Sequence, residues 1–396
     1  MNILFVLYHD FTANSASHTA SFAHELQRLG HECCIAVPAN KDTISCLGPT
    51  TFRAIEFSEL PKLNECFGDG RGPDVVHAWT PREIVRTFSA AVLENFQCRL
   101  FVHLEDNEWH ILSCALNRPV KEIFALTRQE LDKLVGPGLS HPRKAVEFME
   151  RADGVTVIID RLAELAPPGV PSIEIWPSAN PGFFFAEPIS ESSRAGRGIA
   201  KNSIVIAYTG NVHAANACEM RSLYLAVAIL NREGFPTTLV RAGRDFYPFL
   251  APNDDWARPH VIELGLVPHI EVRSVLALAD VLVQPGKSDQ FNDYRFPSKV
   301  PEFLSVGRPV ILPNANIAKH MTHRKHGYVL EEPSAVAIAD AIREIMSDRD
   351  LYSSLSAGAL EFFNERLSWQ ASAEKLNNFY LQTSKVCEAK HLFTCA

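Results

Sequence analysis

Short apolar runs alternate with helical stretches along most of the chain, and this alternation restricts the possible folds more than any other feature. Asn2–Tyr8 is a continuous apolar run, which is typical of a parallel strand buried on both faces. Apolar residues then recur at helical spacing until Gly30, and Cys33–Val37 follows as a second predicted strand. Strands that alternate with helices predict β-α-β units and a parallel sheet.

Two such series are separated by a polar segment, residues 187–201, which has the Ser, Gly and Arg content of a linker. The first series also contains the predicted strands Val75–Ala78, Leu100–His103 and Val155–Ile159 and a longer helical region, Pro119–Met149. The second contains the predicted strands Ile204–Tyr208, Thr238–Val240, Val281–Val283 and Pro309–Leu312 and the helices Ala215–Glu233, Ala335–Met346 and Trp369–Leu381. We therefore predict an α/β protein with two Rossmann-like β/α/β domains facing each other across a cleft. The predicted parts are an N-terminal domain (1–186), the linker (187–201), a C-terminal domain (202–365) and a C-terminal helix (366–396).

Composition excludes some classes of protein. The formal net charge of the 396 residues is −8, which argues against a nucleic-acid binder because such proteins usually carry a basic surplus. No window approaches the ~20 apolar residues of a membrane span, and no cleavable leader is visible at the start. The nine cysteines are dispersed, without metal-ligand spacing, as in reduced cytoplasmic proteins. We expect a cytoplasmic protein, with peripheral contact at the inner face of the membrane left open.

Residues 291–311 carry the most informative polar pattern, because parallel sheets of this kind bind ligands where their strands end. Ser298 is a candidate N-cap for a short helix that begins near Lys299, and free amides at a helix N-terminus favour phosphate. Arg295 and Lys299 add cationic donors, and Glu302 can accept hydrogen bonds from a ribose diol. The pattern suits a nucleoside diphosphate; the alternative is a surface helix with solvated ion pairs.

Two other strand ends of the second series add to this pattern. Gly210, followed by Asn211, allows the backbone to approach a ligand closely, although an ordinary strand-to-helix turn has the same pattern. Arg241 ends the next strand and offers a further cation, with a solvated arginine pair as the alternative.

These pieces, in this order, resemble the retaining glycosyltransferases of family 4 (glycosyl transferases group 1), which include sucrose synthase and mannosyltransferases of bacterial glycolipid synthesis. The matching pieces span nearly the whole chain and are Asn2–Tyr8, Leu29–Glu32, Asp74–His77, Ala152–Val155, Tyr208–Asn211, Pro297–Val310 and Leu367–Trp369. The resemblance implies a GT-B fold, a nucleotide-sugar donor, net retention of anomeric configuration, and a last helix that crosses back to the N-terminal domain.

The sequence departs from the family pattern at three places. The family often carries two acids eight residues apart; here Glu302 fills the second place, but the first is Tyr294, with Asp293 beside it as a substitute. A basic pair common in relatives falls at Asn211 and Ala217, and the loop Thr12–Ser17 lacks the usual glycine. We expect Arg241, Arg295 and Lys299 to take over the duty of that basic pair.

In the first domain, the resemblance places a cleft histidine near the donor sugar, and His103 matches that position. The alternative is a structural histidine bonded to neighbouring carboxylates. We assign the acceptor side to four residues, of which His18, at the start of the first helix, is also expected to meet the donor phosphates: His18, His77, Glu105 and Asp106. The predicted catalytic set is His103, Glu302, Lys299 and Arg241, and the predicted donor-binding set is Gly210, Asn211, Asp293, Tyr294, Arg295, Ser298, Lys299 and Glu302.

The expected reaction moves a sugar from a UDP- or GDP-sugar to an acceptor hydroxyl of a glycan, glycolipid, protein or small molecule. We expect no cofactor and no metal, because the chain has no Asp-x-Asp motif after a strand and His320, His323 and His326 lie among cations. Two alternatives stay open: a catalytically silent partner subunit of the same fold, favoured by Tyr294, and a nucleotide-sugar epimerase. The oligomeric state is left open.

Overall fold

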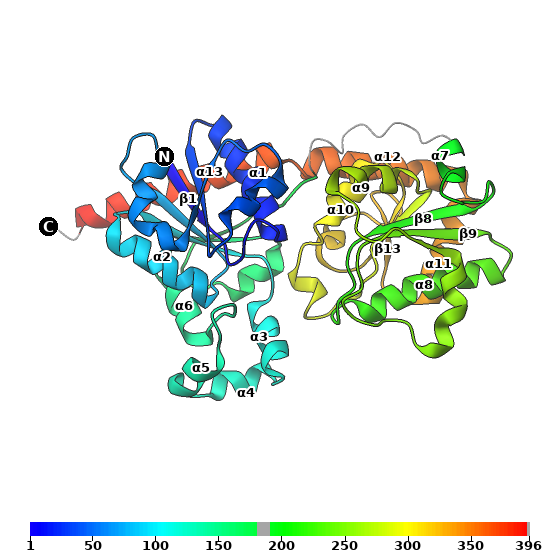
Figure 1. Cartoon of the computed structure of the whole chain (residues 1–396), viewed down its shortest axis with the longest axis horizontal. Helices are drawn as coiled ribbons and strands as arrows, with labels where there is room; N and C mark the ends of the chain where they lie inside the picture. The colour runs from blue at the N-terminus through cyan, green and yellow to red at the C-terminus, as the bar shows by residue number, and fades with distance from the viewer. Residues whose placement is uncertain (180–190, 394–396) are drawn as a thin grey trace. The chain divides into compact units, whose positions relative to one another are not determined.

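The computed structural model describes residues 1–179 and 191–393, and these form two compact units. The first unit contains Met1–Pro177 and the C-terminal residues from Trp369 onward; the second is Ser178–Ser368. Each unit is a parallel sheet with helices on both faces (Figure 1).

The first unit has a seven-stranded sheet in the order β3-β2-β1-β4-β5-β6-β7, and every pairing is parallel. Its strands are β1 (Asn2–Val6), β2 (Glu32–Val37), β3 (Arg53–Glu56), β4 (Val75–Trp79), β5 (Arg99–Leu104), β6 (Gly154–Val157) and β7 (Ser172–Glu174). Its α-helices are α1 (Asn14–Arg28), α2 (Glu83–Asn95), α3 (Glu108–Leu116), α4 (Val120–Ala125), α5 (Arg128–Leu134), α6 (Pro142–Glu150) and α13 (Trp369–Phe393). The 3-10 helices are η1 (Lys41–Leu47), η2 (Phe57–Cys66) and η3 (Asp160–Leu165).

The second unit has a six-stranded parallel sheet in the order β10-β9-β8-β11-β12-β13. Its strands are β8 (Ile204–Thr209), β9 (Thr237–Ala242), β10 (Val261–Glu263), β11 (Val281–Val283), β12 (Val310–Pro313) and β13 (Tyr328–Leu330). Its α-helices are α7 (Glu191–Ala195), α8 (Ala217–Arg232), α9 (His269–Ala277), α10 (Lys299–Ser305), α11 (Ala335–Ser347) and α12 (Arg349–Arg366). The 3-10 helices are η5 (Pro252–His260), η6 (Asn292–Tyr294) and η7 (Asn316–His320).

The C-terminal helix α13 belongs to the core of the first unit. Its residues Leu376 and Tyr380 are completely buried in one apolar cluster with Phe5 and Trp79. Gly154 on β6 makes room for this helix, because a Cβ at that position would lie 2.4 Å from the Phe379 ring. The sheet and α13 therefore pack too closely for any side chain at residue 154.

Local signals explain two differences from the predicted organisation. The region expected as one helical stretch at 119–149 is three helices, because Thr127 caps α5 in a capping box with Glu130 and His141 caps α6. Of the predicted linker, residues 187–190 lie outside the described part. The following residues form α7, and Ile199 is buried in a cluster with β8 and β9, so this stretch packs onto the second unit.

Candidate active site

Each sheet has a point at which its strand order reverses direction, and such points are where α/β folds bind ligands. The order in both units is that of a doubly wound sheet, 3-2-1-4-5-6, with β1 and β8 as the respective first strands. The reversal falls between β1 and β4 in the first unit and between β8 and β11 in the second. Ligands bind beyond the carboxyl ends of these strands, and polar side chains gather there in both units.

In the second unit, Lys299 lies against the turn that follows β8. Its ammonium donates a hydrogen bond to the Tyr208 hydroxyl at 3.0 Å. A Cβ on Gly210 would come within 2.7 Å of the Lys299 Nζ, so a side chain there would displace the ammonium from its present position. The Gly210 turn therefore lies against Lys299 at the start of α10, and Tyr208 is a contact that the sequence patterns did not indicate.

The ends of β8 and β9 approach each other more closely than side chains would allow. Gly243 has a φ of +139°, and a Cβ there would lie 2.1 Å from the Gly210 carbonyl oxygen. The Gly210 amide donates to the Ala242 carbonyl at 2.8 Å, and the Asn211 side chain accepts from the Arg244 amide at 2.9 Å. Gly243 thus fixes the position of the turn against which Lys299 lies.

Gly243→Ala is expected to reduce both stability and nucleoside diphosphate affinity, because the new methyl group must displace the Gly210 backbone. Gly234→Ala is the matched control: Gly234 has a φ of +81° but open space around its Cβ position. The control should cost only the left-handed backbone penalty of about 1–2 kcal/mol. Denaturant unfolding and calorimetry with UDP and GDP measure the two effects. Equal stability losses and equal affinities for the two variants would contradict the close-approach argument.

The loop before α10 is organised around Asn292. Its side-chain oxygen accepts from Arg295 at 2.8 Å, and its amide donates to the buried carboxylate of Glu219 at 2.7 Å. Burial raises the pKa of Glu219, an acid near the start of α8 that the sequence patterns did not single out. Asp293 pairs with Lys319 at 3.0 Å. Tyr294, half-buried at the end of η6, occupies the place of the family acid.

Helix α10 begins at Lys299, as expected, but Ser298 makes no capping hydrogen bond with its side chain. Glu302 lies one turn into the helix and accepts a hydrogen bond from His269 at 3.0 Å. The hydrogen bond to Glu302 raises the pKa of His269. His269 was not predicted, because the two residues are 33 positions apart.

Arg241 is buried in an ion-pair network, in contrast to the free cation expected at this strand end. Its guanidinium pairs with Asp245 and, at 3.2 Å, with Glu263, and it donates to the Tyr224 hydroxyl at 3.3 Å. Only 1% of the residue is exposed. The expectation of a free cation at this strand end is wrong, because the carboxylates of Asp245 and Glu263 already neutralise the Arg241 charge. A catalytic role for Arg241 stays a prediction.

In the first unit, unpaired polar atoms gather at the ends of β4 and β5. Trp79 Nε1, Thr80 Oγ1 and His103 Nε2 are buried and have no hydrogen-bond partner among the described residues. Thr80 has a φ of +85°, a rare conformation for a β-branched residue, and its amide donates to the His103 carbonyl at 3.0 Å. Unpaired buried groups and a strained backbone at a strand end are typical of a ligand site.

His103 is completely buried, and its Nε2 has no hydrogen-bond partner among the described residues. A role for His103 at the donor sugar stays a prediction. Its Nδ1 lies 2.8 Å from the Thr156 hydroxyl, and its ring stacks on Trp79 with 3.9 Å between ring centroids. Burial lowers the pKa of His103 to about 3, so the ring is neutral. The alternative considered from sequence, hydrogen bonding to carboxylates, is not what the structure shows.

Glu105 directly follows β5 and is held by α1. Its carboxylate accepts a hydrogen bond from Ser15 and lies 3.4 Å from the His18 Nδ1. Burial opposes ionisation, but the contact with His18 and the other polar neighbours outweighs it and lowers the pKa of Glu105 to about 2. Two of the four residues assigned to the acceptor side, His18 and Glu105, therefore lie in one cluster, and Asp106 is half-buried next to Glu105 in the sequence.

Glu105→Gln is expected to lower the free energy of unfolding by about 2–3 kcal/mol at pH 7, because the carboxyl group has a folded pKa of about 2 against an ordinary value near 4.3. A depressed pKa stabilises the fold above the unfolded pKa. The difference between wild type and variant should therefore be full above about pH 5 and shrink as the pH falls toward 2. Urea unfolding across pH measures it, with exposed Glu94→Gln as the control. A pH-independent difference would contradict the ionised cluster.

Tyr8, Arg82 and Glu108 complete this edge, and none of the three was assigned a role from the sequence. Arg82 lies 4.0 Å above the Tyr8 ring and pairs with the buried Glu108 at 3.2 Å. Their positions just after β1, β4 and β5 are the signal that could have found them, because all three strands end at one edge. His77, expected in the acceptor pocket, is instead buried inside the sheet between Tyr380 and Thr156.

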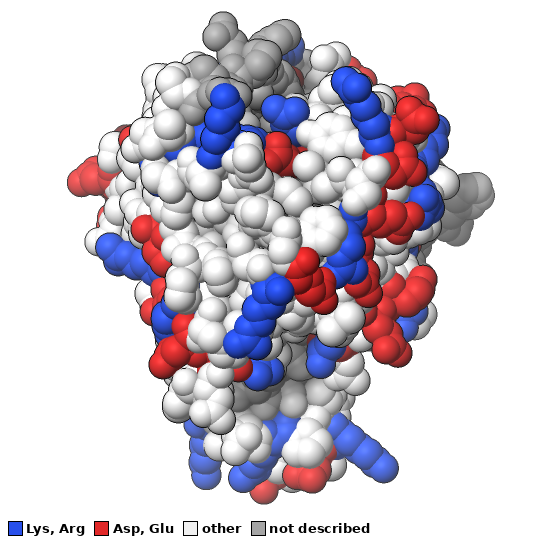
Figure 2. All heavy atoms as spheres, turned by 90° about the vertical axis from the view of Figure 1, so that its right-hand side faces the viewer, with Lys and Arg blue, Asp and Glu red and all other residues white. Residues whose placement is uncertain are grey.

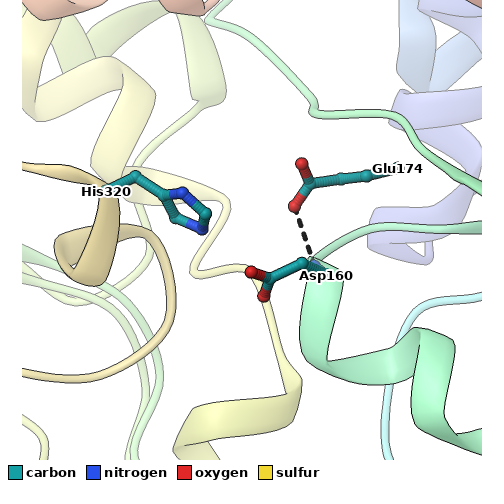
Figure 3. A group of neighbouring side chains, drawn as sticks. All are labelled: Asp160, Glu174 and His320. Atoms are coloured by element: carbon teal, nitrogen blue, oxygen red, sulfur yellow. Dashed lines mark hydrogen bonds between the residues drawn. The ribbon is translucent and has the colours of Figure 1, made fainter.

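Two carboxylates meet at the ends of β6 and β7. The Asp160 amide donates to Glu174 at 2.8 Å, with Asp160 exposed and Glu174 half-buried (Figure 3). His320, also drawn there, belongs to the second unit and ends η7. Two carboxylates within one unit are fewer than the three protein ligands usual for a catalytic zinc, so we assign no metal to them. Metal independence stays a prediction.

The surface drawn in Figure 2 carries Lys and Arg interspersed with Asp and Glu. That face shows no basic stripe of the kind that nucleic-acid binders carry. Among the residues described, no helix has the length and apolar character that a membrane span requires.

Comparison with solved structures identifies the fold. A glycosyltransferase from Rickettsia africae has a TM-score of 0.67 at 12% identity, covering 97% of this chain and 98% of its own. The Anabaena protein HepE, solved with UDP and glucose, has a TM-score of 0.66 at 15% identity and coverage of 96% and 98%. Sucrose-phosphate synthase from Thermosynechococcus elongatus has a TM-score of 0.65 at 15% identity and coverage of 98% and 100%. The chain therefore has a two-domain, Rossmann-like GT-B fold.

A search of curated protein sequences gave no match. The family model described as "Glycosyl transferases group 1" matches residues 203–348, the stretch that contains the Gly210 turn, Lys299 and Glu302. The second unit of this chain is therefore similar, over residues 203–348, to a glycosyl transferases group 1 domain.

Proposed function

We propose that the protein is a retaining, metal-independent glycosyltransferase that moves a sugar from a UDP- or GDP-sugar to an acceptor hydroxyl. The observation that carries the proposal is the position of Lys299, whose ammonium lies 3.0 Å from the Tyr208 hydroxyl beside the Gly210 turn. The Lys299 ammonium lies where the strand order of the second sheet reverses, within the stretch that matches the group 1 family model. Ligands of α/β folds bind at such points, and there the ammonium can neutralise charge on a nucleoside diphosphate. The HepE structures contain UDP, glucose or UDP-glucose, which supports the same donor class here.

The proposed chemistry needs no protein nucleophile. The bond between the anomeric carbon and the diphosphate oxygen breaks, the acceptor oxygen bonds to the same face of that carbon, and its proton moves to the leaving diphosphate. Lys299, with Arg295 nearby on the loop, stabilises the growing negative charge. Glu302 accepts from ribose hydroxyls. His103 and Glu105, at the carboxyl edge of the first sheet, act on sugar and acceptor hydroxyls; a single cleft shared by both units stays a prediction.

A catalytically silent subunit is the second candidate. It is favoured by Tyr294 at the place of an expected acid and by the ion pair that occupies Asp293 with Lys319. Such a protein would bind a nucleotide-sugar without turning it over.

Incubation of the full chain with a panel of UDP- and GDP-sugars, with and without EDTA, tests the proposal. A transferase slowly hydrolyses one donor to free sugar and nucleoside diphosphate, and the rate should survive the chelator. Isomerised donor would indicate an epimerase. Saturable donor binding without turnover would indicate the silent subunit, and activity lost with EDTA and restored by Mg²⁺ or Mn²⁺ would refute metal independence.

A further inference from the structure

Four buried polar side chains of the first unit form a continuous hydrogen-bonded chain that ends at His103. The Tyr380 hydroxyl lies 2.7 Å from His77 Nδ1, His77 Nε2 lies 2.9 Å from the Thr156 hydroxyl, and that hydroxyl lies 2.8 Å from His103 Nδ1. All four residues are completely buried. They come from α13, β4, β6 and β5, so the chain links the C-terminal helix to the strand end that carries the unpaired His103 Nε2.

Both imidazoles in this chain are neutral. Burial lowers the pKa of His103 to about 3 and, with the neighbouring His103, holds the pKa of His77 well below its ordinary value. A neutral imidazole has one N–H donor and one acceptor nitrogen. Each of the three contacts needs one donor and one acceptor, so the protons can run through the chain in either of two directions. A third arrangement, in which both imidazoles donate to the Thr156 oxygen, leaves the Thr156 O–H and His103 Nε2 without partners and costs as many unpaired groups as the less favourable direction described next.

Tyr380 distinguishes the two directions. Its hydroxyl has a single hydrogen-bond partner in the described part of the chain, His77 Nδ1. If Tyr380 donates, His77 donates to Thr156, Thr156 donates to His103 Nδ1, and His103 carries its proton on Nε2. In the reverse direction, the Tyr380 O–H has no acceptor inside the core and His103 Nε2 is a bare acceptor. The first direction leaves one donor unpaired, whereas the second leaves a donor and an acceptor unpaired, and such groups cost about 1–3 kcal/mol each when buried.

We propose that Tyr380 is a positioning residue that fixes His103 as its Nε2–H tautomer, so that His103 presents a hydrogen-bond donor, and not a base, at the end of β5. The unpaired donor then requires an oxygen acceptor. That this acceptor is a hydroxyl or phosphate oxygen of the nucleotide-sugar rests on the proposed function; the tautomer itself does not. Trp79, stacked on the His103 ring, keeps the Nε2–H direction fixed.

The tautomer is measured by long-range ¹H–¹⁵N NMR of the full chain labelled with ¹⁵N-histidine, without substrate. The His103 signals are assigned by their loss in His103→Gln. Wild type should show a protonated Nε2 and an unprotonated Nδ1. In Tyr380→Phe the two directions leave equal numbers of unpaired groups, so both His103 tautomers should be populated. Wild-type His103 protonated on Nδ1, or a Tyr380→Phe protein that retains only the Nε2–H form, would overturn the proposal.

Three further variants separate the relay from general packing. Thr383→Val removes a hydroxyl one turn along α13 that donates only to helix carbonyls, and it should leave the His103 tautomer unchanged. Thr156→Ser keeps the relay hydroxyl and should behave like wild type, whereas Thr156→Val removes it and should mix the tautomers. This pair also tests the relay if Tyr380→Phe fails to fold. A Thr156→Val protein with the wild-type tautomer would count against the relay.

The rate of donor turnover tests whether the His103 tautomer is used in sugar transfer. Tyr380→Phe should lower kcat for donor hydrolysis by less than His103→Ala does, with KM for the donor unchanged, because the relay sets a proton position and not donor binding. A protein that turns over no nucleotide-sugar would refute the proposed function and leave the NMR result standing. An unchanged kcat in Tyr380→Phe, in a protein whose tautomers are mixed, would show that the His103 donor is not used in transfer.

Discussion

His103→Ala is expected to lower the rate of sugar transfer by about 100-fold or more while donor affinity changes little. The reason is that a neutral, fixed N–H donor at the end of β5 contributes most when negative charge develops on an oxygen, and removal of one such preorganised donor typically costs about 10²–10³ in kcat. Donor dissociation constants from calorimetry and single-turnover rates measure the two quantities separately.

Glu302→Gln is expected to weaken donor binding more than it slows transfer, the reverse of His103→Ala. It keeps the shape of the side chain but loses the ionised acceptor for ribose hydroxyls, which are held in the ground and transition states alike, so the donor dissociation constant should rise by roughly tenfold. Because Glu302 also pairs with His269, His269→Gln is the matched control and should change donor affinity less.

For the first of these predictions, a His103→Ala protein with the wild-type transfer rate would make His103 a purely structural histidine.

Lys299→Ala is expected to weaken binding of a nucleoside diphosphate by about 1.5–3 kcal/mol, as for the loss of a charge-assisted contact. The ammonium lies against the Gly210 turn and donates a hydrogen bond to the Tyr208 hydroxyl, and its other N–H donors can reach a phosphate. Lys287→Ala is the control, because it removes the same charge from an exposed position in the same loop. Calorimetry with UDP and GDP gives the affinities.

Measuring the affinity for the corresponding nucleoside shows whether the loss in Lys299→Ala is specific to the diphosphate. Nucleosides lack the diphosphate, so their binding should be the same in wild type and Lys299→Ala. Equal losses for nucleoside and diphosphate would indicate damage to the whole pocket, and an unchanged diphosphate affinity would remove Lys299 from the site.

The sequence alone determined the architecture, because strand and helix formation depend on local periodicity. The continuous apolar run at residues 2–8 predicted a strand buried on both sides, and β1 is buried along its whole length. The turn at Gly210 and the start of a helix at Lys299 were likewise local signals, and both are present. Sequence reasoning therefore located the strand ends that carry the candidate site.

Only the tertiary structure decided what the polar side chains at those ends contact. The sequence predicted a free cation at Arg241. In the structure, Glu263 on the neighbouring strand pairs with the buried Arg241 guanidinium and neutralises its charge. His77 reads as a pocket residue, but its partner Tyr380 lies 303 positions away on α13. Hydrogen bonds and ion pairs between distant segments leave no periodic trace in the sequence, because they depend on how strands order and helices pack. The proton position on His103 is therefore a property of the folded chain and not of any motif.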